Sequence, residues 1–117
     1  MRKANEAAAL VALNTIKVAE TKFAGDHKER YGTFRELFDE GYLDKRFNFD
    51  QPAIRGYIFI LKVTPKSGGN AATFMLNANP EVSQGLGATG KVFYYTDPDN
   101  GVCFNRSGPA TADDEML

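Results

Sequence analysis

The sequence is poor in the residues from which catalytic and metal centres are most often built. Its 117 residues include one cysteine, Cys103, one histidine, His27, and no tryptophan. A single cysteine excludes an internal disulfide and a zinc site made of cysteines, and a single histidine excludes a metal site with several histidine ligands. We therefore expect no disulfide framework and no cofactor held by a cluster of thiolates or imidazoles.

An excess of cations and a long apolar run are also missing. The chain has 14 Lys and Arg against 15 Asp and Glu, which gives a formal net charge of -1 and a pI near 5.8. Without a basic excess to neutralise phosphates, we expect no nucleic-acid partner. No run approaches the roughly 20 apolar residues that a membrane-spanning helix needs, so we expect the chain itself to be soluble. Its length predicts one domain, residues 1–105, followed by a flexible acidic tail at residues 106–117.

Apolar residues in the first part of the sequence recur with the period of an α-helix, from about residue 4 to residue 25. At about 100° per residue they form one broad apolar face, which is typical of a helix packed on a core. Its members are Ala9, Ala12, Leu13, Ile16, Ala19 and Phe23. Glu20 lies within this face, and we expect its carboxylate near an edge of the face, in contact with water.

A smaller apolar stripe lies on roughly the opposite side of the same helix. It consists of Ala7, Val11 and Val18. The stripe has two interpretations: a surface that packs against another helix at close distance, or ordinary exposed aliphatic residues, which are normal on soluble proteins. No Ser, Thr, Asp or Pro precedes Ala4 where helices usually begin, and residues 2 and 3 are cations where anions are preferred. We therefore expect the native helix to continue upstream of this chain.

The residues after the helix predict a short second helix and then an antiparallel sheet. Thr33 and Glu36 have the spacing of a capping box, which starts a helix that runs to about Glu40 and ends at Gly41. We call residues 26–55, which contain this helix, the αβ-loop. From residue 56 to residue 105 apolar and polar residues alternate, as they do in strands. We predict an α+β fold in which the long helix packs on a three- to four-stranded antiparallel sheet. The expected core contains Ala9, Leu13, Ile16, Phe23, Tyr57, Phe59, Leu61, Phe74 and Leu76.

Enzymatic activity is poorly supported by these residues. Cys103 and His27 are candidates for a nucleophile and its base, but Cys103 lies within a predicted strand, where a buried cysteine ordinarily serves as a small apolar residue. His27 lies in the charged segment at residues 26–30, which is typical of a solvated helix end. The glycine-rich segment at residues 85–90 lacks the Lys-Ser/Thr pair and the following helix of a phosphate-binding loop. We therefore predict no catalytic residues and no nucleotide cofactor.

Several segments together resemble a known family. Residues 5–16, with the sequence NEAAALVALNTI, resemble the segment that follows the membrane part of bacterial type IV pilins and of the major pseudopilins of type II secretion systems. Later segments resemble the αβ-loop, the sheet and the small-residue tail of that family; they are YGTF at 31–34, GYLD at 41–44, GY at 56–57, FYYTD at 93–97 and PATA at 109–112. The resemblance covers nearly the whole chain in order, and it implies a pilin-like fold.

The chain departs from the family pattern in two respects. It does not contain the leader, the methylated phenylalanine or the apolar half-helix with a glutamate, and we expect these to precede Met1 in the native protein. A lone Cys103 cannot form the disulfide with which many pilins close their C-terminal region. Major pseudopilins often have a calcium site in this region, and Asp97 and Asp99 are weak candidates for its ligands. The sequence PDNG after Asp97 is also fully explained by a hairpin turn.

The resemblance implies a structural subunit that polymerises through its N-terminal helix into a type IV pilus or a type II secretion pseudopilus. Ala7, Val11 and Val18 would then be the residues through which helices pack in the filament. The expected partners are copies of the same chain, other pilins or pseudopilins, and the inner-membrane assembly machinery. The native protein would be anchored in the inner membrane and then enter a periplasmic or cell-surface filament. The alternative is an extracytoplasmic sensory or ligand-binding module, which predicts an apolar pocket between the sheet and the loop.

Overall fold

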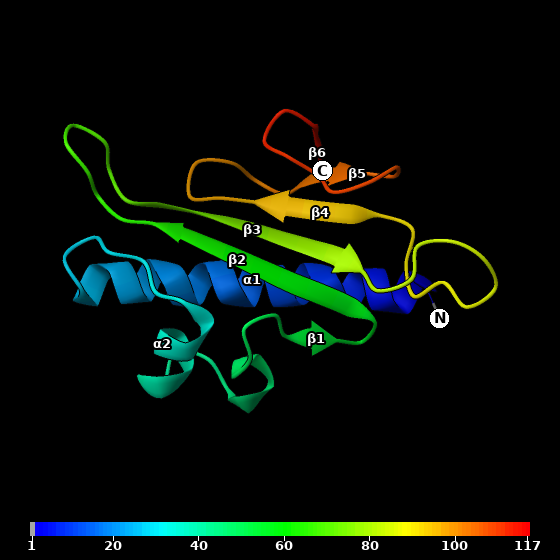
Figure 1. The fold of residues 1–117 in the computed structure, drawn as a ribbon, viewed down its shortest axis with the longest axis horizontal. Helices are drawn as coiled ribbons and strands as arrows, with labels where there is room; N and C mark the ends of the chain where they lie inside the picture. The colour runs from blue at the N-terminus through cyan, green and yellow to red at the C-terminus, as the bar shows by residue number, and fades with distance from the viewer. Residues whose placement is uncertain (1) are drawn as a thin grey trace.

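A long N-terminal helix lies across one face of an antiparallel sheet (Figure 1). The computed structural model describes residues 2–117, with α1 at Arg2–Asp26, α2 at Phe34–Asp39 and a 3-10 helix, η1, at Lys45–Phe47. Within these residues the sheet has six strands, which are β1 (Ala53–Ile54), β2 (Tyr57–Thr64), β3 (Thr73–Pro80), β4 (Phe93–Thr96), β5 (Cys103–Asn105) and β6 (Glu115–Met116). Each strand is antiparallel to the next, and the strands lie in the sheet in chain order.

The sheet is larger than the sequence predicts. A pilin-like sheet of three to four strands is expected, whereas the described residues form six strands, so that prediction is wrong. The physical reason is that β1 and β6 have two residues each, which is too short for an alternating pattern to show. Arg55 and Gly56, at φ 49° and 83°, turn the chain directly from β1 into β2 as a two-residue hairpin. The fold is α+β, with one long helix and a six-stranded antiparallel sheet.

The C-terminal segment also differs from the expectation. The flexible acidic tail predicted at residues 106–117 instead folds back on the sheet, where β6 pairs with β5. Ala110 is buried, and its carbonyl oxygen accepts a hydrogen bond of 2.9 Å from Asn77 Nδ2 on β3. Asn105 Nδ2 donates another to Asp114 Oδ1 at 3.1 Å. Such contacts between polar groups leave no periodic apolar pattern in the sequence, so sequence reasoning does not reveal them.

The core lies between α1 and the inner face of the sheet. Eight of the nine expected core residues are at most 1 % exposed; they are Ala9, Leu13, Ile16, Phe23, Tyr57, Phe59, Phe74 and Leu76. The ninth, Leu61, is partly buried and packs against the same cluster. Fully burying a Leu, Ile or Phe side chain contributes about 1.5–3 kcal/mol to folding. These contacts therefore hold α1 firmly on the sheet.

The capping box predicted for the second helix is confirmed. Thr33 Oγ1 accepts a hydrogen bond from Glu36 N at 3.2 Å, and Glu36 Oε1 accepts one from Thr33 N at 3.0 Å. Gly41 follows the helix at φ 83°, a conformation that favours glycine. Phe34 and Leu37 are buried in the main core, so α2 anchors the αβ-loop to the rest of the domain.

Glu20 requires a correction, because its carboxyl group does not reach water. The side chain is fully buried; Oε1 accepts a hydrogen bond of 2.8 Å from Gly32 N, and Oε2 has no partner among the described residues. Burial raises the pKa of this carboxyl group from 4.5 to about 8, although the hydrogen bond from Gly32 lowers it. Glu20 is therefore mainly protonated at pH 7. The expectation failed because the αβ-loop folds over this part of α1, which helix periodicity does not reveal.

The raised pKa of Glu20 predicts that the protein loses stability as the pH rises. The unfolded carboxyl group releases its proton near pH 4.5 and the folded one near pH 8. This group's contribution is therefore fully present below pH 4.5 and is lost between pH 4.5 and 8. The loss in the free energy of unfolding is on the order of 4 kcal/mol. Glu20→Gln, which cannot ionise, should flatten this dependence and exceed the unsubstituted protein in stability at pH 9.

Urea unfolding from pH 4 to pH 9 measures the effect. The exposed Glu81→Gln is the matched control and should keep the original pH dependence. An unchanged slope in Glu20→Gln would show that a different group is responsible.

Candidate functional site

The side of α1 that faces away from the sheet is exposed and made of small residues. Val11 and Val18 are 68 % and 44 % exposed. We call the exposed stripe that contains them the outer helix face; it consists of Ala4, Ala7, Val11, Asn14, Val18 and Thr21. Its members alternate in steps of three and four residues, which is the spacing with which one helix packs along another. The sequence analysis found Ala7, Val11 and Val18 but missed Ala4, Asn14 and Thr21, although this spacing identifies them.

A hollow of about 350 Å³ borders the outer helix face in its C-terminal half. It is lined by Asn14, Thr15, Val18, Ala19, Lys22 and Tyr42. Because Tyr42 belongs to the αβ-loop, the hollow lies between α1 and that loop. The lining contains the cation Lys22 and no acidic residue. The result is a shallow groove of small side chains with a positive charge at its edge.

Polar contacts near the N-terminal end of α1 fix its rotation on the sheet. Asn5 Nδ2 donates a hydrogen bond of 2.9 Å to Thr89 O, and Glu6 Oε2 accepts one of 2.8 Å from Lys91 N. Both partners belong to the loop between β3 and β4. That loop is itself tied to the sheet, since Thr89 Oγ1 donates to Gly56 O at 2.7 Å. Asn5 and Glu6 therefore point toward the domain, and the outer helix face points away from it.

Lys17 makes a similar contact in the middle of α1. Its ammonium group donates to Asn100 O at 2.6 Å, in the turn between β4 and β5, and to Thr96 Oγ1 at 3.3 Å, at the end of β4. A hydrogen bond from an ionised donor is roughly twice as strong as a neutral one. This contact holds the far strands of the sheet to the helix.

The calcium candidates Asp97 and Asp99 lie in the same turn, where Asp97 already accepts several hydrogen bonds. Its Oδ1 accepts from Asp99 N, Asn100 N and Asn100 Nδ2, and its Oδ2 accepts from Tyr95 OH and Asn100 Nδ2, at 2.7–2.9 Å. Burial raises the pKa of Asp97, but these hydrogen bonds together bring it below its usual value. A calcium ion bound by Asp97 would have to displace these donors.

His27 packs the C-terminal end of α1 against the αβ-loop. Its Nδ1 lies 2.9 Å from Phe23 O, and its Nε2 lies 2.8 Å from Glu40 Oε1. Because both partners are acceptors, both ring nitrogens donate, which requires the protonated ring. The hydrogen bonds to Phe23 O and to the Glu40 carboxylate raise the pKa of His27 accordingly. The ring also stacks on Phe23 at 3.8 Å between centroids, and nearby the Tyr42 hydroxyl donates to Asp26.

The structure does not bring together the candidate nucleophile and base. Cys103 is buried on β5 beside Tyr95 and Ala110, and burial raises the pKa of its thiol. A raised pKa leaves less of the reactive thiolate. His27 instead contacts Phe23 and Glu40 at the end of α1. Within residues 2–117 no group of three or more His, Cys, Asp or Glu is placed to hold a metal ion.

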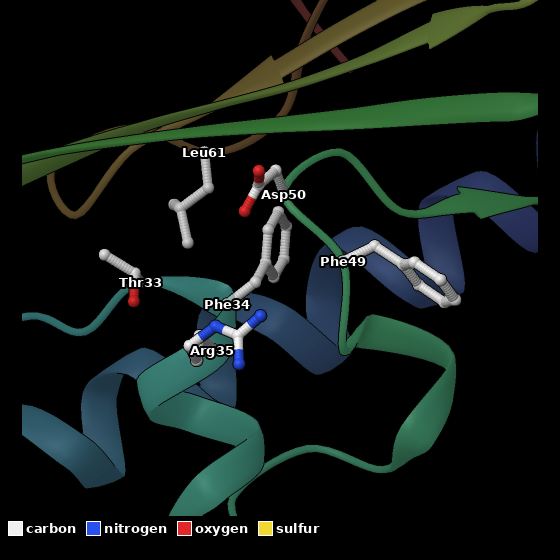
Figure 2. A pocket seen from close by; sticks show the side chains of 6 residues that line it. All are labelled: Thr33, Phe34, Arg35, Phe49, Asp50 and Leu61. Carbon is white, nitrogen blue, oxygen red and sulfur yellow. The ribbon is translucent and has the colours of Figure 1, made fainter.

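A second hollow, of about 340 Å³, lies between β2, α2 and the αβ-loop. It is lined by Thr33, Phe34, Arg35, Phe49, Asp50 and Leu61. Figure 2 shows Leu61 and Asp50 directed toward the Phe34 ring, while the Phe49 ring points away from it. The lining combines apolar side chains with one cation and one anion. Sequence reasoning named Leu61 as a core residue but did not find this hollow, because its residues come from three separate segments.

No protein-family model matches the chain, and neither a curated protein nor a solved structure is significantly similar to it. Among the described helices none is long and apolar enough to cross a membrane. The function is therefore argued from the outer helix face, the contacts that orient it, and the hollows.

The contact of Lys17 with the β4–β5 turn leads to a prediction about stability. We expect Lys17→Met to lower the free energy of unfolding by about 1–3 kcal/mol, because Asn100 O loses its charged donor. Lys22→Met is the matched control on the same helix, since the described residues record no hydrogen bond for the exposed Lys22. Its effect should stay within about 0.5 kcal/mol. Chemical denaturation measures both variants, and equal losses would contradict the prediction.

Proposed function

We propose that the chain is a structural subunit of a helical filament, of the type IV pilus or type II secretion pseudopilus kind, and that it polymerises through α1. The observation that carries this proposal is the outer helix face. Val11 and Val18 expose apolar carbon on one side of α1, while the other side of the helix is buried in the core. The contacts of Asn5, Glu6 and Lys17 hold the helix in this orientation.

The apolar area that the outer helix face exposes is small, and this limits how much the face can contribute to the stability of a filament. Burying the remaining surface of Val11 and Val18 is worth about 2 kcal/mol in total. That is too little to hold a filament together without other contacts. In this proposal most of the buried surface belongs to an apolar half-helix upstream of Met1. The outer helix face then sets the register and the distance between neighbouring helices, for which small residues are suited.

The proposed partners are copies of the same chain, other pilins or pseudopilins, and the inner-membrane assembly machinery. The upstream half-helix would hold the subunit in the inner membrane before it enters a periplasmic or cell-surface filament. The resemblance of residues 5–16 to the corresponding pilin segment supports this arrangement. The proposal assigns no catalytic residue and no cofactor.

Introducing two positive charges on the outer helix face tests the proposal. In a chain that carries the upstream apolar half-helix, Val11→Lys together with Val18→Lys should abolish filaments, because two ammonium groups would be buried between helices. The fold should be unaffected, since both side chains point to solvent. Electron microscopy measures assembly, and thermal unfolding measures the stability of the domain.

The matched control places the same two charges on exposed apolar residues elsewhere. Met75 and Val82 are 41 % and 44 % exposed and lie outside α1, so Met75→Lys with Val82→Lys should assemble normally. Normal filaments from the Val11 and Val18 variant would overturn the role of the outer helix face. Loss of assembly in both variants would show that added charge alone prevents it.

A ligand-binding module is the second candidate, and the hollow between β2, α2 and the αβ-loop favours it. Its volume of about 340 Å³ is within the range of small-molecule sites. Phe34 and Leu61 offer an apolar surface, while Arg35 and Asp50 offer opposite charges. This arrangement suits a small amphipathic molecule with an ionic group.

A thermal-shift measurement tests this second candidate. We expect small aromatic carboxylates at millimolar concentration to raise the unfolding temperature, and Arg35→Gln to remove the shift because it removes the cation from the lining. Arg46→Gln, outside the hollow, is the control and should keep the shift. No shift with the unsubstituted chain would exclude this ligand class.

A further inference from the structure

Four cationic residues from three segments of the chain meet at the N-terminal end of α1. They line a hollow of about 260 Å³ with the residues Arg2, Lys3, Glu6, Lys91, Val92 and Arg106. Arg2 and Lys3 open α1, Lys91 precedes β4, and Arg106 follows β5. We call the four cations the basic cluster. It is found in a chain whose acids outnumber its Lys and Arg by 15 to 14.

The positive charge of the basic cluster is not cancelled by ion pairs. The ion pairs recorded within residues 2–117 join His27 to Glu40, Arg30 to Glu36 and Arg46 to Asp44, and none involves the basic cluster. The one acid in the lining, Glu6, accepts its hydrogen bond from the backbone of Lys91 instead.

Arg106 differs from the other three members of the basic cluster. It lies over the Phe104 ring, 5.0 Å from its centroid, and also borders a hollow that contains Asp114 and Glu115. These acids reduce its contribution to the field outside the molecule. Lys3 and Lys91 are therefore the members best suited to a test.

The position of the basic cluster leaves its positive charge largely uncompensated and accessible. The first turn of α1 contains no acid, so no side chain in that turn offsets the charges of Arg2 and Lys3. Like charges gathered there destabilise the fold slightly unless negative charge lies outside the molecule. In Figure 1 this end of α1 lies near one end of the molecule's longest axis, which measures 46 Å, and the loop between β3 and β4 extends somewhat farther along that axis. A flat anionic surface that approaches there meets the end of α1 together with this loop, which also contains Lys91.

We propose that the basic cluster rests on the anionic headgroups of a lipid bilayer. This inference depends on the proposed filament function, which places the N-terminal end of α1 at the inner membrane. All four residues are exposed, and they surround an open hollow instead of a buried cradle of donors. Such an arrangement fits a surface of many phosphates better than one small anion.

The expected binding is weak and measurable. Each Lys or Arg near an anionic membrane surface strengthens binding by about fivefold. Three effective charges then give a partition coefficient on the order of 100 per molar, so about one third of the protein would be bound at about 5 mM accessible lipid. Acids elsewhere on the molecule contribute little, because charges beyond a Debye length of about 10 Å are screened at 0.1 M salt.

Sedimentation with vesicles tests the proposal on the 117-residue chain. We expect binding to vesicles that contain one third phosphatidylglycerol and none to pure phosphatidylcholine vesicles. Lys3→Gln with Lys91→Gln should weaken binding by about 25-fold, since two charges are removed. Lys45→Gln with Lys66→Gln is the control: it has the same net charge and the same amino terminus, and it should bind as the unsubstituted chain does.

The outcomes separate the possible explanations. Absence of binding to anionic vesicles, or equal weakening in both double variants, would overturn the proposal. Competition by millimolar inorganic phosphate at constant ionic strength would assign the basic cluster to a free anion and overturn the membrane contact. Filament assembly is measured separately on the Val11 and Val18 variant, so failure of the membrane contact and failure of the filament proposal give different results.

Discussion

Docking of one side of α1 against β2 and β3 is the constraint on which the other features depend. Leu13, Ile16 and Phe23 are fully buried in this contact, together with Phe59 and Leu76 from the sheet. A helix of 25 residues is about 38 Å long, so this one contact runs through most of the molecule. Once that side of α1 is buried, no helix or strand among residues 2–117 covers the opposite side. The outer helix face is thus a direct consequence of how the core is built.

Apolar packing alone would allow α1 to rotate slightly or slide, and the polar contacts prevent this. Asn5 and Glu6 bind the β3–β4 loop, Lys17 binds the β4–β5 turn, and Glu20 accepts a hydrogen bond from the αβ-loop. Together these contacts join the helix to three different connections between elements. Because neighbouring helix residues are 100° apart, these side chains together leave one direction free, and that direction is the outer helix face.

Sequence reasoning succeeded where a pattern repeats or a local rule applies. The helix period identifies the buried and exposed sides of α1, and the capping box identifies the start of α2 at Thr33. It failed where the determinant is distant in sequence. Glu20 is buried because Gly32 and the αβ-loop cover it, and β6 forms because the chain returns to β5. The basic cluster unites residues about 100 positions apart, which no local pattern indicates.

The two proposed surfaces of α1 imply one orientation relative to a membrane. Lys3 and Lys91 lie at the end of the helix, whereas Val11 and Val18 lie along its side, roughly 12 and 23 Å from Lys3 along the helix axis. A helix lying flat on an anionic surface would carry its cations along its side, beside its apolar residues. Here the charges gather at the end, and the side consists of small uncharged residues, among which Val11 and Val18 expose apolar carbon. An upright helix satisfies both surfaces at once: its end contacts the headgroups, and its side stays free for neighbouring helices.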